Sequence, residues 1–121
     1  MDKNFYITTP IYYPSAKPHM GHAYSSIIAD FFARFKRMDG YEVHFLTGTD
    51  EHGLKIQRAA EKEKIDTLKF CNEISQTFRD LSKTLNLSNT DFIRTTEDRH
   101  KKTVQHLWTQ LEKNDGIYLS K

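Results

Sequence analysis

Two histidines and a glycine are the residues of this sequence best suited to chemistry. His19 and His22 are three positions apart with Gly21 between them, in the segment "KPHMGHAYSSIIADFF" at 17–32. The segment starts as a loop and continues as an amphipathic helix, so both imidazoles are expected at a helix N-terminus. Backbone N–H groups and the helix dipole favour an anion there, and imidazoles can donate hydrogen bonds to phosphate oxygens. Because Gly21 has no side chain, a flat ring such as adenine could lie close to the backbone.

Other roles for the two histidines stay open on the residues alone. Histidines at positions i and i+3 can chelate a metal ion, with Asp50 or His52 as the third ligand. Both could equally be exposed helix residues, since such a short pattern also occurs by chance.

Asp50 is a second candidate for chemistry. It lies in the turn "GTDEHG" at 48–53, directly after the β-rich segment "YEVHFLT" at 41–47. Its carboxylate could pair with the ammonium group of a substrate. It could instead cap the helix that is expected to begin at Glu51–Leu54.

The loop "PIYYPSAKP" at 10–18 precedes the histidines, and its prolines keep it out of regular structure. Its apolar and aromatic residues either line a small hydrophobic pocket or pack within the loop. These residues are Ile11, Tyr12 and Tyr13.

Strands alternating with helices are expected to position these residues. Strands are predicted at 4–9, 41–47 and 91–96, with a further strand beginning at "IYLSK" (117–121). Helices are predicted at 19–38 and 54–63, then along the stripe from Leu68 to Leu85, and last between Thr95 and the "DG" at 115–116. This order predicts an α/β fold, the first half of a Rossmann-like parallel sheet flanked by helices, with ligands at the carboxyl ends of the strands.

Apolar stripes at helical spacing predict the core. The three stripes are Ile27, Ile28, Phe31, Phe35 and Met38; Leu68, Cys71, Ile74, Phe78, Leu81 and Leu85; and Val104, Leu107, Trp108 and Leu111. Thr95, followed three residues later by Asp98, resembles a capping box for the last helix.

Composition places the chain among globular proteins. Of its 121 residues, 37% are hydrophobic and 28% charged, and the formal net charge of +2 gives no argument for nucleic-acid binding. Cys71 is the only cysteine, which excludes an internal disulfide and favours a reducing, cytoplasmic setting. No run of residues approaches the roughly 18 apolar positions of a membrane span, so no membrane association is expected.

Several motifs together resemble the amino-terminal part of the methionyl-tRNA synthetase family of class I aminoacyl-tRNA synthetases. "HMGH" is similar to the H-I-G-H motif of that class, and "TTPIYYPS", "HMGHAYS" and "TGTDEHG" follow in the family's order and spacing. "DFIRTTEDRH" is also similar, so the resemblance covers essentially the whole chain.

The resemblance implies a reaction and roles for individual residues. L-methionine and ATP, with Mg²⁺, would form methionyl-adenylate and pyrophosphate, and the methionyl group would pass to tRNA(Met). His19 and His22 would be catalytic and, with Gly21, would bind ATP. Asp50 would bind the methionine ammonium group. The methionine pocket would also be shaped by Pro10, Ile11 and Tyr13.

The resemblance also implies that parts of the family's pattern lie outside these residues. The K-M-S-K-S loop, the second half of the fold, an inserted domain that often carries zinc, and the anticodon-binding domain have no match here. We therefore expect residues 1–121 to be the amino-terminal portion of a class I synthetase catalytic domain, inactive alone. The alternatives are a nucleotidyltransferase with a related H-x-G-H motif and a partial domain without activity.

Overall fold

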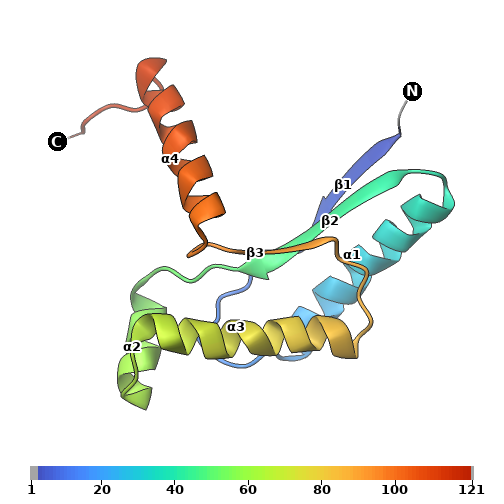
Figure 1. Ribbon diagram of the computed structural model, residues 1–121, viewed down its shortest axis with the longest axis horizontal. Helices are drawn as coiled ribbons and strands as arrows, with labels where there is room; N and C mark the ends of the chain where they lie inside the picture. Colours follow the sequence, from blue (N-terminus) through green and yellow to red (C-terminus); the bar gives the residue numbers. More distant parts are fainter. Residues whose placement is uncertain (1–2, 121) are drawn as a thin grey trace.

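The computed structural model describes residues 3–120. It consists of a parallel sheet of three strands flanked by helices (Figure 1). The strands are β1 (Asn4–Thr8), β2 (Glu42–Thr49) and β3 (Asp91–Arg94), with β2 in the middle. The helices are α1 (Met20–Met38), α2 (Leu54–Glu63), α3 (Thr67–Thr84) and α4 (Asp98–Lys113). The predicted α/β class with parallel strands is confirmed.

The strand register brings the functional segments to one edge of the sheet. β1 pairs with the first part of β2 and β3 with its last part, so that Leu46 lies opposite both Thr8 and Asp91. Gly48 allows β2 to approach β3, since a Cβ there would lie 2.0 Å from the carbonyl oxygen of Ile93. Because all strands run the same way, the segments after β1, β2 and β3 all leave from the carboxyl edge.

Helix α1 packs on the sheet through small residues, which corrects the predicted core. Its buried apolar side chains are alanines, and Ala29 and Ala33 contact Val43 and Phe45 of β2. The predicted stripe is instead exposed, with Ile27 at 50%, Ile28 at 41%, Phe31 at 63%, Phe35 at 53% and Met38 at 87%. Helical periodicity identifies an apolar stripe, but alanine allows a closer approach to the sheet than phenylalanine does.

Helix α3 contributes to both of the other core clusters. Cys71 packs with Ile56 and Ala60 of α2, and Phe78 packs with Tyr12 and Phe92. Of the predicted α3 stripe, Cys71 and Phe78 are buried, whereas Ile74, Leu81 and Leu85 are half-buried and Leu68 is exposed.

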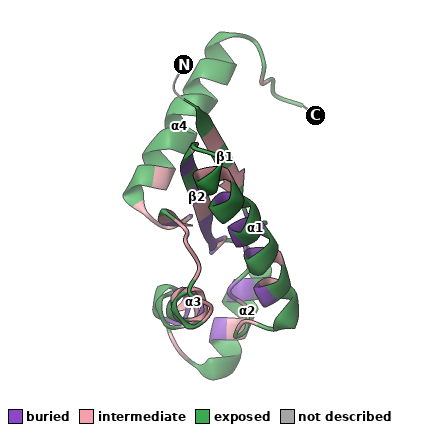
Figure 2. Ribbon diagram, turned by 90° about the vertical axis from the view of Figure 1, so that its right-hand side faces the viewer, coloured by how far each residue is buried: buried purple, intermediate pink, exposed green. Residues whose placement is uncertain are grey.

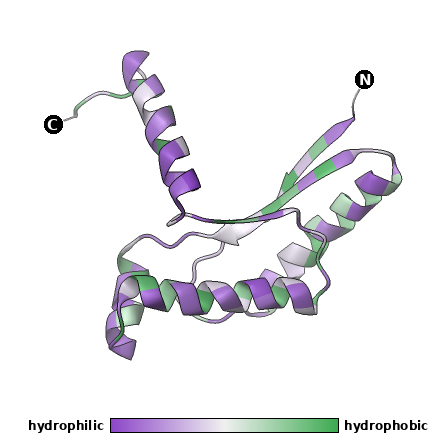
Figure 3. Ribbon diagram, in the orientation of Figure 1, coloured by the Kyte–Doolittle hydropathy of each residue, from purple (hydrophilic) through white to green (hydrophobic). Residues whose placement is uncertain are grey.

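Helix α4 projects away from the sheet and from α2 and α3 (Figure 1). None of its residues is buried (Figure 2), and it is predominantly hydrophilic (Figure 3). The prediction that α4 has a buried inner face is therefore wrong for the described residues. The side chains of that face are 47%, 57%, 58% and 42% exposed, for Val104, Leu107, Trp108 and Leu111 respectively. No other described element covers that face.

Two further predictions at the end of the chain are wrong. The N-cap of α4 is Glu97, with no side-chain capping bond, and the Thr95 hydroxyl accepts the backbone N–H of Glu51 instead. Residues 117–120 form no strand, and Lys121 lies outside the described residues.

Candidate functional site

The loop after β1 returns alongside the end of β2. The N–H of Tyr12 donates to the carbonyl of Gly48 at 3.1 Å, and the N–H of Asp50 donates to the carbonyl of Tyr12 at 2.8 Å. Tyr12 thus forms an isolated parallel bridge with Thr49. These backbone bonds attach the loop that leads into α1 to the residues next to Asp50.

The Tyr12 side chain fixes that loop to α1 and α3. Its hydroxyl lies 2.9 Å from Ser26 Oγ and donates to the carbonyl of His22 at 3.2 Å, and its ring stacks on Phe78 with centroids 5.5 Å apart. Tyr12 is buried, whereas Tyr13 is 56% exposed. Tyr12 therefore packs against neighbouring residues, which is one of the two alternatives for the loop aromatics. Tyr13 remains accessible for contact with a ligand.

His19 and His22 cap the first turn of α1 reciprocally. Nδ1 of His19 accepts the N–H of Gly21 at 3.0 Å, and Nδ1 of His22 accepts the N–H of His19 at 3.0 Å. The two ring centroids are 3.8 Å apart. This is a capping box in which two imidazoles replace the usual hydroxyl and carboxylate.

The capping bonds determine which ring nitrogen can donate. A nitrogen that accepts carries no proton, so in each neutral ring the proton is on Nε2. Burial lowers the pKa of His22, and the nearby His19 lowers that pKa further. His22 therefore stays neutral around pH 7, as an Nε2–H donor with no partner among the described residues.

Gly21 is required by the position of the His19 ring. A Cβ at position 21 would lie 2.9 Å from Cε1 of His19, which is closer than such contacts allow. A side chain there would push the ring away from the first turn of α1. The structure therefore gives Gly21 a role in placing His19, besides the approach of adenine that the sequence predicts.

The two histidines line a cavity of about 330 Å³. Its other lining residues are Ile11, Tyr12, Tyr13, Ser15, Ala16, Lys17 and Lys55. Lys17 and Lys55 bring two positive charges beside the imidazoles, which suits an anionic ligand. Pro10 and Asp50 are not among the described residues that line it, although Asp50 lies at the same strand edge.

Asp50 is held by backbone and side-chain bonds at the end of β2. Its Oδ1 accepts the Thr95 hydroxyl and the N–H of His52, each at 3.4 Å. The N-cap of α2 is Gly53, with no side-chain capping bond, so the capping alternative for Asp50 is wrong.

Within residues 3–120, no group of three or more His, Cys, Asp or Glu side chains could hold a metal ion. The ring of His52, one proposed third ligand, instead donates from Nε2 to the carbonyl of Thr95 at 3.2 Å. Among the described helices, none has the length and apolar character needed to cross a membrane.

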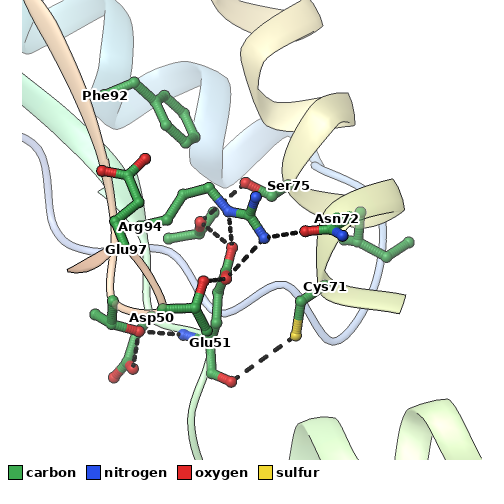
Figure 4. A network of polar contacts seen from close by, with 12 residues as sticks. Asp50, Glu51, Cys71, Asn72, Ser75, Phe92, Arg94 and Glu97 are labelled. Atoms are coloured by element: carbon green, nitrogen blue, oxygen red, sulfur yellow. Dashed lines mark hydrogen bonds and ion pairs between the residues drawn. The ribbon is translucent and has the colours of Figure 1, made fainter. Parts of the chain in front are cut away.

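Sequence reasoning missed a buried ion pair beside Asp50 (Figure 4). The Glu51 side chain is fully buried, and Nε and Nη2 of Arg94 donate to its two oxygens at 2.7 and 2.9 Å. The sequence did contain one indication of this pair, which is a carboxylate directly after one strand and an arginine at the end of the next strand. Their pairing depends on β2 and β3 being neighbours.

The chain matches a known family over nearly its whole length. A family model described as tRNA synthetases class I (M) matches residues 5–121. The chain belongs to this family. The resemblance drawn from the motifs is confirmed, and membership of a synthetase family argues against the nucleotidyltransferase alternative.

Relatives in this family are named methionine–tRNA ligases. The chain is 54% identical over 117 residues to the mitochondrial enzyme of Takifugu rubripes, which covers 97% of this chain and 20% of that protein. It is 55% identical over 119 residues to the enzyme of Listeria monocytogenes, covering 98% of this chain and 18% of that protein. The chain thus spans about a fifth of the length of these curated relatives.

A solved structure has the same fold. The methionyl-tRNA synthetase of Mycobacterium tuberculosis, bound by methionyl-adenylate, superimposes with a TM-score of 0.89 at 46% identity. The match covers 91% of this chain and 22% of that one. The class I (M) synthetase fold is therefore present in the described residues.

Proposed function

We propose that the protein containing this chain is a methionine–tRNA ligase. It activates L-methionine with ATP to methionyl-adenylate, releases pyrophosphate, and transfers the methionyl group to tRNA(Met). Residues 1–121 form the amino-terminal portion of its catalytic domain. Support comes from the family, from the names of the relatives, and from a solved relative that binds methionyl-adenylate.

One observation about this chain carries the proposal. Among residues 3–120, the reciprocal histidine cap leaves an Nε2–H group on each ring without a hydrogen-bond partner, at the N-terminus of α1 and on the same strand edge as Asp50. Phosphates meet favourable electrostatics there, and preorganised N–H donors can receive the charge that develops on pyrophosphate. His19 and His22 thus bind ATP and stabilise the transition state.

The methionine end of the site is assigned to Asp50 and the loop after β1. The Asp50 carboxylate pairs with the methionine ammonium group, and Gly21 allows adenine to approach the backbone. Pro10, Ile11 and Tyr13 shape the methionine pocket. Ile11 and Tyr13, 41% and 56% exposed, are available for contact.

Mg²⁺ enters with ATP as part of the substrate, and we assign it no ligand from this chain. For zinc, likewise, residues 3–120 offer no group of three side chains that could bind it. We also propose a cytoplasmic location, with the mitochondrial relative from Takifugu rubripes marking the alternative compartment.

An ATP–pyrophosphate exchange assay on the full-length protein tests the proposal. Exchange should depend on methionine and should be far slower with leucine, isoleucine or norleucine. A protein that exchanges equally with all of these, or with none, is not a methionine–tRNA ligase. An inactive protein would support the remaining alternative of a domain without activity.

A further inference from the structure

The Glu51 carboxylate is completely enclosed at the carboxyl end of β2 (Figure 4). Besides Arg94, the Thr49 hydroxyl donates to it at 2.9 Å, and the Thr96 hydroxyl donates as well. Burial by itself raises the pKa of Glu51, but the hydrogen bonds from Arg94, Thr96 and Thr49 bring that pKa below its usual value. Glu51 is therefore a charged group with saturated hydrogen bonding.

The partner arginine connects three elements. Arg94 ends β3, pairs with Glu51 after β2, and donates from Nη2 to Oδ1 of Asn72 on α3 at 2.6 Å. Such a bidentate pair has a fixed geometry, which a contact between aliphatic side chains would not impose. The pair thus sets the relative position of the residues that follow β2 and β3.

Those residues are Asp50 and Thr95, which contact each other. The Thr95 hydroxyl accepts the N–H of Glu51 at 2.8 Å, and it donates its single proton to Oδ1 of Asp50 at 3.4 Å. The Thr95 carbonyl accepts from the ring of His52, whose own N–H donates to the same Oδ1. Thr95 is itself buried, at 6% exposure.

Both donors to Asp50 lie on one of its oxygens. Within residues 3–120, Thr95 and His52 occupy Oδ1, and no described residue donates to Oδ2. The bonds to Oδ1 limit rotation of the carboxylate and leave Oδ2 for a ligand. A carboxylate held this way loses little freedom when it binds an ammonium group.

We propose that Thr95 is a positioning residue that orients the Asp50 carboxylate for an α-ammonium group, and that the Glu51–Arg94 ion pair holds Thr95 in place. This inference rests on the proposed function, in which Asp50 binds methionine. It adds a residue whose sequence pattern indicated only a helix cap.

The test compares Thr95→Val with Thr95→Ser in the full-length protein. Valine keeps the shape and removes the hydroxyl, so the KM for methionine should rise about 3- to 10-fold, while the KM for ATP stays within about twofold. Serine keeps the hydroxyl and should restore a KM near that of the unmodified protein. Thr103→Val is the matched control, because that hydroxyl is exposed on α4 and bonds only within its own helix.

Two methionine analogues separate positioning from general disturbance of the site. Inhibition by methioninol, which keeps the amino group, should weaken in Thr95→Val by the same factor as methionine binding. Inhibition by 4-(methylthio)butanoate, which lacks the amino group, should not change. Equal weakening of both analogues, or a serine variant as impaired as the valine variant, would overturn the positioning role.

Folding and the proposed function are checked in the same experiment. Urea unfolding of each variant reports its stability, and Thr95→Ala replaces the valine variant if the latter does not fold. If the unmodified protein shows no methionine-dependent exchange, the proposed function fails and this inference fails with it. If the unmodified protein is active but Thr95→Val or Thr95→Ala leaves the methionine KM unchanged, only the positioning role fails.

Discussion

The carboxyl ends of β2 and β3 differ sharply from the outer sides of α1 and α4. In the former region, polar side chains are buried, and no buried side-chain nitrogen or oxygen among the described residues lacks a partner. In the latter, large apolar side chains such as Phe31 and Trp108 are 63% and 58% exposed. The residues at the carboxyl ends of β2 and β3 therefore complete the support for Asp50 among themselves, whereas α1 and α4 present apolar surfaces that no described element covers.

The largest effect is expected when the chain is tested alone. Under the proposed function, the described residues supply only one wall of a triphosphate site, through His19 and His22. Removing one preorganised donor from a transition state costs about 10²–10³-fold, and the family resemblance places several more donors outside these residues. The isolated 121-residue chain should therefore show no measurable methionine-dependent ATP–pyrophosphate exchange. A rate within about tenfold of the full-length protein would show that the chain is a complete catalyst.

Breaking the buried ion pair should have a large effect on stability. Glu51→Gln keeps the shape but leaves Arg94 without its charged partner, which costs about 3–5 kcal/mol in the free energy of unfolding. Urea unfolding followed by circular dichroism measures it, with Glu61→Gln on the exposed side of α2 as the control. A cost below about 1 kcal/mol would mean that the pair contributes little.

The same pair predicts a pH dependence of stability. The pKa of Glu51 is lowered from its ordinary value of 4.5, so its contribution to stability is complete above about pH 4.5. That contribution is lost as the pH falls through the lower pKa of the folded protein. Glu51→Gln should therefore lose less stability than the unmodified protein between pH 5 and about pH 2. Parallel losses in the two proteins would assign the acid sensitivity to other carboxylates.

Within the site, substitutions of Asp50 and of His22 should impair different steps of the reaction. Asp50→Asn removes a charge-assisted bond worth about 1.5–3 kcal/mol, so kcat/KM for methionine should fall roughly 10- to 150-fold with little change in ATP use. His22→Ala should slow adenylate formation more than it weakens methionine binding, because it acts where charge develops. Steady-state kinetics with each substrate varied separately gives both values. Equal losses for both substrates in both variants would contradict this division of roles.

The smallest effect is expected on the exposed side of α4. Trp108→Gln should change the free energy of unfolding of the isolated chain by less than about 0.5 kcal/mol, because the side chain is 58% exposed. Phe78→Ala, at a position 2% exposed, should cost about 3–5 kcal/mol in the same experiment. If Trp108→Gln destabilised the full-length protein far more than the isolated chain, another segment would cover this side of α4.

Sequence reasoning predicted the elements better than their contacts. The bounds of α1 follow from its periodicity and from the "DG" that ends it, and the alternation of strands and helices gives the α/β class. Periodicity failed to identify the buried side of α1, because that helix has two apolar sides and its smaller residues pack on the sheet. The role of Thr95 as a helix cap was predicted wrongly. Its hydroxyl accepts the N–H of Glu51, which is distant in the sequence, instead of an N–H in the first turn of α4.

The candidate site divides in the same way. Local spacing determined that His19 and His22 lie at a helix N-terminus, since a glycine and two histidines within four residues can cap one turn among themselves. The carboxyl-edge location of Asp50 also follows from the strand that precedes it. Only the tertiary structure decided that Glu51 pairs with Arg94 and that the Thr95 hydroxyl donates to Asp50. These partners are 43 and 45 positions apart in the chain, and they meet only because β2 and β3 pair in one register.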